Sequence, residues 1–246
     1  MTVTISPTLS TTPSPATTPV PAGGVTSAAS HPRERLLSLD VFRGLTVAGM
    51  LLVNNPGSWG AIYPPLAHAR WHGWTPTDLI FPFFLFIVGI TTHLSLEARR
   101  ARGDDERALV RQIVKRGLLI ILFGLLLAAF PYTPLTRITE MRFPGVLQRI
   151  GLAYLCGGLL TLRTSLKQQV VILVVLLYGY WFAMTLVPVP GRGIGALLLD
   201  DPSASLAAWI DRAVFGSHVW RSAKTWDPEG LLSTIPAIGT VMLGVL

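Results

Sequence analysis

Long apolar stretches, separated by polar segments, constrain the fold of this chain more than any other feature. Five of them have the length of about 17–25 residues that spans a bilayer as a helix. A sixth is still apolar where the sequence ends. The six are Leu36–Asn54, Asp78–Leu96, Ile113–Phe130, Val146–Leu162, Val170–Val189 and Leu231–Leu246. Only 13% of the residues are charged, against about 25% in soluble domains. The pattern predicts an all-α protein, a polytopic bundle of about six transmembrane helices.

The segments outside these stretches set the expected domain bounds. Residues 1–32 are rich in Thr, Pro, Ser and Ala and carry no formal charge, a composition typical of disordered tails. We therefore expect a disordered cytoplasmic tail at 1–32 and a membrane domain at 33–246. Because no polar or basic residues follow the last apolar stretch, we also expect this domain to be incomplete and the sequence to be a piece of a longer membrane protein.

Basic residues gather in a few of the links. The segment from Glu97 to Arg116 holds seven, and others precede the first stretch or follow the fourth. They are Arg33, Arg35, Arg99, Arg100, Arg102, Arg107, Arg111, Lys115, Arg116, Arg163 and Lys167. Since Lys and Arg mark cytoplasmic loops, we expect a cytoplasmic N-terminus and outward-facing loops at 55–77, 131–144 and 188–230. A net charge of +7 could also indicate nucleic acid. The clustering favours membrane topology, so no nucleic-acid partner is expected.

Two polar sites lie on the first apolar stretch. Asp40 and Arg43 are three residues apart and therefore share one helix face. They either form an ion pair that fixes the start of the helix or line a polar cavity. Asn54, at the outer boundary, either caps the helix or donates a hydrogen bond to a developing oxyanion. The residues alone leave both alternatives open at each site.

The outward-facing loops carry histidine and tryptophan. His68 and His72 have a spacing that can bind zinc on a helix, but no Glu or Cys completes the set nearby, so no metal site is expected. A histidine at a membrane cavity suits a general base or nucleophile, because its unperturbed pKa is about 6.5. An ordinary loop histidine is the alternative. The tryptophans form either an interfacial belt or a carbohydrate-stacking surface; they are Trp59, Trp71, Trp74, Trp209, Trp220 and Trp226.

Further polar side chains lie at the outer ends of the later stretches. Asp78 opens the second stretch, where a carboxylate suits the helix dipole. Gln148 and Arg149 open the fourth, and Asp227 and Glu229 precede the sixth. The expected topology places all five on the same face as the histidines of the first loop. Ionisable residues at membrane depth are functional candidates.

Six motifs occur in an order that resembles a known family. They are Ser38–Gly44 (SLDVFRG), Val53–Asn54 (VN), His68–Trp71 (HARW), Thr77–Pro82 (TDLIFP), Phe143–Ile150 (FPGVLQRI) and Asp227–Thr234 (DPEGLLST). Over about residues 34–246 the chain is similar to the heparan-α-glucosaminide N-acetyltransferase family and looks like a bacterial member. The resemblance implies a fold of ten or eleven transmembrane helices. It also implies transfer of an acetyl group from acetyl-CoA to the amino group of a glucosamine-type sugar across the membrane.

The resemblance also ranks the candidate residues. The family's active-site histidine falls on His68 and its Val-Asn asparagine on Asn54, so catalytic roles are expected for both. Weaker expectations of substrate or cofactor binding fall on Asp40, Arg43, Trp71, Asp78, Gln148, Arg149, Asp227 and Glu229. The interval from Asn54 to His68 is a few residues longer than in the lysosomal enzyme, and the six helices expected here are fewer than the family's ten or eleven. No glycine-rich phosphate loop is present, so CoA is expected to bind between helices.

Several alternatives follow from this resemblance. His68 either accepts a proton as general base or attacks the thioester and carries the acetyl group itself, while Asn54 donates to the carbonyl oxygen. The expected location is the bacterial inner membrane, with the His68 loop on the periplasmic side. Expected partners are acetyl-CoA, an amino-sugar or glycan acceptor and the lipid bilayer. A homodimer is also considered, because relatives form dimers, although nothing in this sequence indicates one. The competing interpretations are an amino-sugar transporter, although no internal repeat is seen, and an inactive membrane fragment.

Overall fold

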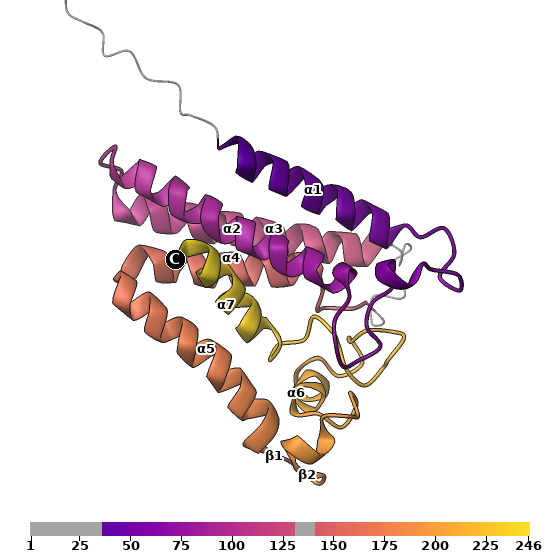
Figure 1. Cartoon of the computed structure of the whole chain (residues 1–246). Helices are drawn as coiled ribbons and strands as arrows, with labels where there is room; N and C mark the ends of the chain where they lie inside the picture. The colour runs from indigo at the N-terminus through magenta and orange to yellow at the C-terminus, as the bar shows by residue number, and fades with distance from the viewer. Residues whose placement is uncertain (1–35, 131–140) are drawn as a thin grey trace, which may run out of the picture. The chain divides into compact units, whose positions relative to one another are not determined.

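Helices dominate the computed structural model, which describes residues 36–130 and 141–246. The predicted tail at 1–32 and most of the loop after the third apolar stretch lie outside these described residues. The described part of the chain contains seven α-helices, two short 3-10 helices and one antiparallel pair of two-residue strands (Figure 1). In chain order they are α1 (Leu37–Asn54), η1 (Pro64–Leu66), α2 (Pro76–Arg100), α3 (Glu106–Ala129), α4 (Val146–Arg163), α5 (Leu166–Leu186), β1 (Pro188–Val189), β2 (Gly193–Ile194), η4 (Gly195–Leu198), α6 (Leu206–Phe215) and α7 (Thr234–Val245). The predicted all-α class is confirmed.

Within the described residues, four helices, α1, α2, α3 and α5, are long and apolar enough to cross a membrane, and α7 is a shorter apolar helix. The protein is therefore a multi-pass membrane protein. Each of the six predicted stretches contains a helix, but α4 is less hydrophobic than the four spans because it carries Gln148, Arg149 and Arg163. The apolar pattern did not reveal α6, whose ten residues are too few for a span. Its cap is Ser205, whose hydroxyl accepts from the Ala208 N–H at 3.2 Å.

Polar caps lengthen two of the predicted helices at their N-termini. Thr75 and Asp78 form a reciprocal capping box, so α2 begins at Pro76 rather than at Asp78. Ser165 and Gln168 form another, so α5 begins at Leu166 rather than at Val170. Such boxes satisfy backbone N–H groups that have no partner inside the helix. Both extensions come from side-chain chemistry that hydropathy alone does not detect.

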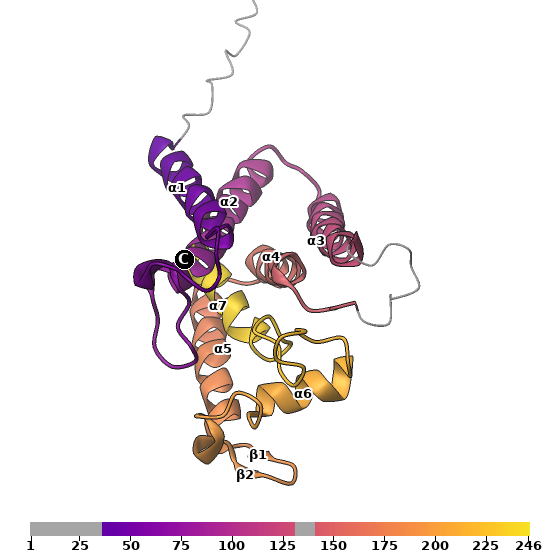
Figure 2. The ribbon, with the colours of Figure 1, turned by 90° about the vertical axis from the view of Figure 1, so that its right-hand side faces the viewer.

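Glycines allow the central helices to approach closely. α4 packs against α2, α3 and α7, and Figure 2 shows it lying between α2 and α3. A Cβ on Gly151 of α4 would lie 2.8 Å from the Gly117 carbonyl oxygen of α3. A Cβ on Gly89 of α2 would lie 2.0 Å from the Val241 carbonyl oxygen of α7. Small residues drive helix association in membranes because they let backbones meet. The buried core beside these crossings is Leu85, Ile150, Ala153, Ala237 and Val241.

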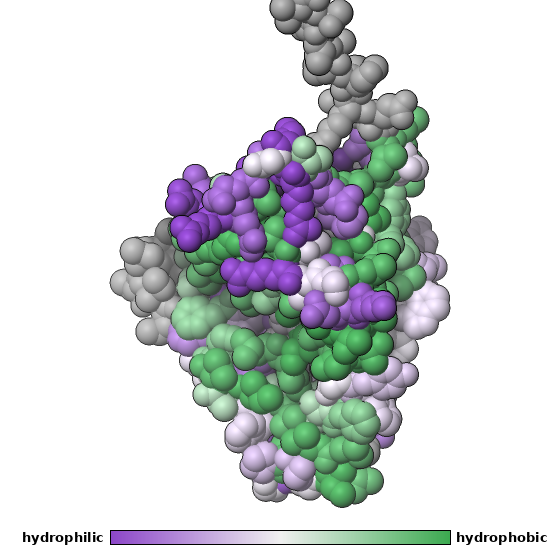
Figure 3. Space-filling model, turned by 90° about the vertical axis from the view of Figure 1, so that its left-hand side faces the viewer, coloured by the Kyte–Doolittle hydropathy of each residue, from purple (hydrophilic) through white to green (hydrophobic). Residues whose placement is uncertain are grey.

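The bundle has two chemically different ends. At one, which we call the basic end, the α2–α3 connection meets the α4–α5 link, because the Arg100 guanidinium donates to the Leu162 carbonyl oxygen. Figure 3 shows hydrophilic residues gathered on the upper part of one face and hydrophobic residues below them. The opposite end, which we call the cavity end, holds the start of α2, the end of α5 and α6 (Figure 1). The predicted grouping of basic links 97–116 and 163–167 at one end agrees with this arrangement; Arg33 and Arg35 lie outside the described residues.

Candidate functional site

A cavity of about 610 Å³ opens at the cavity end of the bundle. It takes side chains from the loop before α2, from the segment before α4, from α5 and α6, and from the loop before α7. Its polar and aromatic lining includes Trp59, His68, Arg70, Trp71, Asp78, Arg142, Tyr180, Ser205, Asp211, Trp220, Trp226, Asp227, Glu229 and Ser233. Five of the sequence-predicted site residues meet here: His68, Trp71, Asp78, Asp227 and Glu229.

A histidine–carboxylate pair lies in this lining. Nδ1 of His68 lies 2.6 Å from Oδ1 of Asp78. The other carboxylate oxygen of Asp78 accepts from the N–H groups of Ala69 at 3.1 Å and Thr75 at 2.8 Å. These backbone hydrogen bonds therefore fix the orientation of the Asp78 carboxylate that contacts the imidazole. A carboxylate acceptor at Nδ1 favours the tautomer in which Nδ1 carries the proton and Nε2 keeps a lone pair. This arrangement suits a base or a nucleophile.

Three tryptophans form a connected aromatic cluster along the cavity. The rings of Trp71 and Trp226, and those of Trp220 and Trp226, meet edge to face, each pair with centroids 5.4 Å apart. The indole N–H of Trp71 donates to the Leu199 carbonyl oxygen at 2.5 Å. All three rings line the cavity. Aromatic faces in a polar cavity offer apolar area to a ring-shaped ligand, whereas Trp74 and Trp209 are not among the lining residues.

Arg142 ties together the two acids of the Asp227–Thr234 motif. Its Nε donates to Oδ2 of Asp227 at 2.8 Å, and its Nη2 pairs with both Asp227 and Glu229. Burial lowers the pKa of Arg142, but the hydrogen bond to Asp227 and the charge of Glu229 outweigh it and leave the pKa above its ordinary value. The Asp227 side chain is fully buried. The sequence did not single out Arg142, although a buried carboxylate needs a cation and Arg142 directly precedes the Phe143–Ile150 motif.

Asp211 is a second residue that the sequence did not single out. It is fully buried on α6, and its Oδ1 accepts from the Leu231 N–H at 2.9 Å. Among the described residues, its Oδ2 has no hydrogen-bond partner. Burial raises the pKa of this carboxyl above its usual range. A Cβ at Gly230 would lie 2.0 Å from Oδ2, so only glycine leaves room for Asp211. The sequence does not identify Asp211 as a candidate because α6 lies in the segment 188–230, which is predicted to be a loop.

Two predicted residues of α4 lie beside the cavity lining. Nη2 of Arg149 donates to the Pro228 carbonyl oxygen at 2.6 Å and to the Ser233 hydroxyl. It therefore holds the loop that carries Asp227 and Glu229. Gln148 is buried and lines a neighbouring pocket of about 480 Å³ that also touches Arg142.

Three predicted residues lie apart from the cavity, all on α1. The Asn54 amide donates to the Met50 carbonyl oxygen at 2.8 Å within its own helix. Asp40 and Arg43 form an exposed ion pair near the start of α1. None of the three is among the lining residues. His72 is also separate, with Nε2 2.8 Å from Oδ1 of Asp200.

The comparisons with known proteins agree on one family. The family model for the catalytic region of heparan-alpha-glucosaminide N-acetyltransferase matches residues 35–202 of this chain. Heparan-alpha-glucosaminide N-acetyltransferase of Homo sapiens is 32% identical over 86% of this chain and 38% of its own length. The Mus musculus protein of the same name shows the same identity and coverage. This chain thus spans 38% of the length of these relatives. It belongs to the heparan-alpha-glucosaminide N-acetyltransferase family.

Proposed function

We propose that this chain moves an acetyl group from acetyl-CoA to the amino group of a glucosamine-type sugar, and that transfer occurs in the cavity around His68. Family membership supports N-acetyl transfer. The observation that carries the site is the His68–Asp78 pair inside the cavity. Because the chain spans 38% of the relatives' length, the activity of the chain itself is the hypothesis under test.

The proposed chemistry is direct transfer with His68 as general base. The sugar nitrogen attacks the thioester carbonyl, a C–N bond forms, and the C–S bond breaks. Nε2 of His68 takes the proton that the nitrogen loses and passes it to the departing CoA sulfur, which leaves as the thiol. Asp78 holds the imidazole in the required tautomer through the 2.6 Å contact. A positioned base of this kind contributes about 10²–10⁴ in rate.

The rest of the cavity suits an amino sugar. The faces of Trp71, Trp220 and Trp226 offer apolar area on which a sugar ring packs, and all three line the cavity. Glu229 keeps part of its carboxylate exposed beside them, where it can accept from sugar hydroxyl or amino groups.

The Asn54 amide donates a hydrogen bond to a backbone carbonyl oxygen within α1. Its proposed role as a donor to the thioester carbonyl therefore rests on the resemblance to the family alone. On the same basis, CoA binding by Asp40, Arg43, Gln148 or Arg149 stays a prediction.

The proposed orientation puts the basic end in the cytoplasm and the cavity on the periplasmic face of a bacterial inner membrane. The clustering of Arg and Lys at the basic end supports it. Trp59 lines the cavity and Arg102 lies in the link at the opposite end. In intact cells, a membrane-impermeant maleimide should label Trp59→Cys and leave Arg102→Cys unlabelled. The reverse pattern would invert the orientation.

Acetyl transfer tests the function, with His72 as a matched control. His68 and His72 are similarly exposed, and each contacts one carboxylate, but only His68 lines the cavity. Membranes holding the full chain should acetylate glucosamine from acetyl-CoA. His68→Ala should lower turnover by about 10²–10⁴ and His72→Ala by less than about twofold. Absent transfer by the unmodified chain would refute its activity, and equal loss in both variants would refute the role of His68.

A second measurement separates the routes and the rival function. After incubation with radiolabelled acetyl-CoA alone, the purified chain should retain no acetyl label on His68 if transfer is direct. Stable label that is lost on adding glucosamine would replace the direct route with a covalent one. Uptake of labelled N-acetylglucosamine into vesicles without acetyl-CoA would favour a transporter instead.

A further inference from the structure

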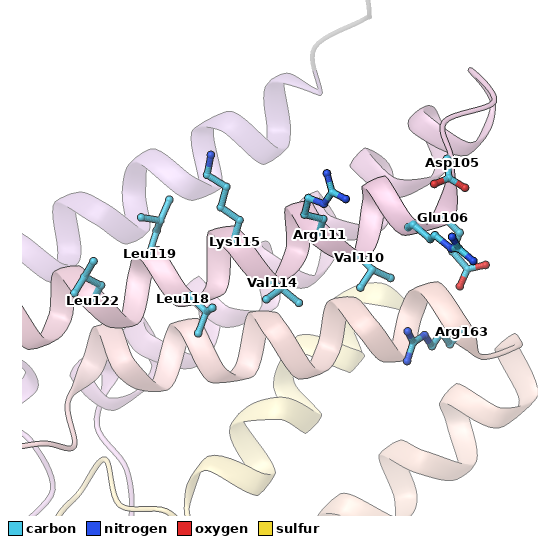
Figure 4. A pocket seen from close by; sticks show the side chains of 11 residues that line it. Asp105, Glu106, Val110, Arg111, Val114, Lys115, Leu118, Leu119, Leu122 and Arg163 are labelled. Carbon is cyan, nitrogen blue, oxygen red and sulfur yellow. The ribbon is translucent and has the colours of Figure 1, made fainter.

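A separate groove of about 910 Å³ lies on α3 at the basic end of the bundle. Figure 4 shows α3 side chains along it, with Arg163 at the end of α4 beside them. Its lining comprises Asp105, Glu106, Arg107, Val110, Arg111, Val114, Lys115, Leu118, Leu119, Leu122 and Arg163. None of these residues lines the cavity around His68. The groove therefore belongs to a different site.

The groove changes from basic to apolar along α3. Arg107, Arg111 and Lys115 are spaced four residues apart, so they lie on one helix face. Leu118 and Leu122 continue that face deeper into the span. From residue 107 to residue 122 an α-helix rises about 22 Å. One continuous strip thus carries cations at its start and leucines at its end.

The cations of the groove are not engaged by acids. Arg107, Arg111, Lys115 and Arg163 are all exposed, and no ion pair joins any of them to a carboxylate within residues 36–130 and 141–246. Arg99 nearby differs, because its Nε lies 2.5 Å from Oδ2 of Asp104. The two acids of the groove, Asp105 and Glu106, stand at the N-terminus of α3, where they complement the helix dipole. The four basic side chains therefore outnumber the acids and attract an anion.

The apolar half of the groove indicates what kind of anion it attracts. Leu118, Leu119 and Leu122 are 55%, 39% and 49% exposed. They belong to a helix that is long and apolar enough to cross a membrane, so they face hydrocarbon rather than water. A soluble anion would use the basic half and leave the leucines unused. A phospholipid has a charged head and an acyl chain in the same order as this strip, and long basic side chains reach toward the interface from such positions.

We propose that this groove binds one anionic phospholipid, with its phosphate among Arg107, Arg111, Lys115 and Arg163 and an acyl chain along Leu118, Leu119 and Leu122. The site is independent of acetyl transfer. It fixes a lipid at the junction of α3 and α4, the two helices that meet at Gly117 and Gly151.

Native mass spectrometry of the full chain tests the proposal. The protein is titrated in detergent with phosphatidylglycerol or with phosphatidylcholine of the same acyl chains. Phosphatidylglycerol should bind at least about tenfold more tightly. Each basic side chain near the headgroup contributes roughly fivefold, so Arg111→Gln/Lys115→Gln should weaken binding by about 20- to 30-fold. Arg102→Gln/Lys167→Gln removes the same charge from exposed positions outside the groove and should change it by less than about twofold.

Several outcomes would overturn the site. Equal weakening by the two double variants would indicate a general electrostatic effect, and equal binding of the two lipids would remove the selectivity. Inorganic phosphate that binds as tightly as the lipid, or six-carbon acyl chains that bind as tightly as sixteen-carbon chains, would remove the role of the leucines. Far-ultraviolet circular dichroism and gel filtration verify folding. If the double variant is misfolded, Arg111→Gln alone should still weaken binding by about fivefold.

Discussion

Nδ1 of His68 lies 2.6 Å from Oδ1 of Asp78, and both side chains line the same cavity. The two residues are only ten positions apart, yet they come from different elements, a loop and the first turn of α2. The carboxylate is fixed by its own helix cap and in turn fixes the ring. This order of dependence makes Asp78 the positioning residue for His68.

Replacing Asp78 with Asn should reverse the tautomer. The amide would donate to Nδ1 and place the proton on Nε2, which removes the base. We expect kcat to fall by about 10²–10⁴, by analogy with other oriented histidines, while KM changes little. Asp200→Asn, which removes the partner of His72, is the matched control and should leave kcat unchanged. A normal kcat in Asp78→Asn would show that the carboxylate only caps α2.

Arg142→Gln should destabilise the cavity end. Asp227 is fully buried and would lose its cation, and breaking a buried pair on one side costs about 3–5 kcal/mol. Thermal unfolding in detergent, followed by tryptophan fluorescence, measures the loss. Adding Asp227→Asn should recover part of it. Arg43→Gln breaks an exposed pair and should cost less than about 1 kcal/mol; an equal loss there would contradict the argument.

Gly89→Ala should separate α2 from α7. The new Cβ would meet the Val241 carbonyl oxygen at 2.0 Å, and backbone cannot move aside as a side chain can. Overpacking of this kind costs about 1–3 kcal/mol. Gly179→Ala is the control, because nothing lies within 4 Å of a Cβ there. Midpoints of thermal unfolding compare the two, and equal stability would show that the crossing tolerates a methyl group.

Asp211 should make stability depend on pH. Burial raises the pKa of its carboxyl in the folded state, so the folded state holds its proton more tightly than the unfolded state. This contribution to stability is complete below the unfolded pKa of about 3.9. It is lost as pH rises through the folded pKa. Unfolding midpoints of the parent chain should therefore fall over that range more steeply than those of Asp211→Asn. Parallel pH profiles would show that Asp211 titrates normally.

The helices could be predicted from the sequence because a bilayer requires long apolar stretches, and the motifs singled out His68, Asp78, Asp227 and Glu229, which line one cavity. What hydropathy could not reveal depends on pairing across the fold. Arg142 pairs with Asp227, which lies 85 positions away in the sequence. The local sequence around each residue does not identify the other as its partner. Asp211 was missed because α6 is short and lies among turn residues. The expected topology places Asn54 on the same side of the membrane as His68, but its amide donates a hydrogen bond to the Met50 carbonyl oxygen within α1.

The central position of α4 bears on how this protein enters a membrane. α4 is less apolar than the four candidate spans because it carries Arg149 near one end and Arg163 at the other, and charged residues disfavour the insertion of a helix on its own. Gly151 and Gly157 of α4 allow it to pack closely against α3 and α7. Insertion of α4 therefore depends on neighbours that are already in place or arrive with it. Substitutions at Gly151 or Gly157 would then appear in the cell first as faulty biogenesis, with stalled or degraded chains, before any assay detects a slower enzyme.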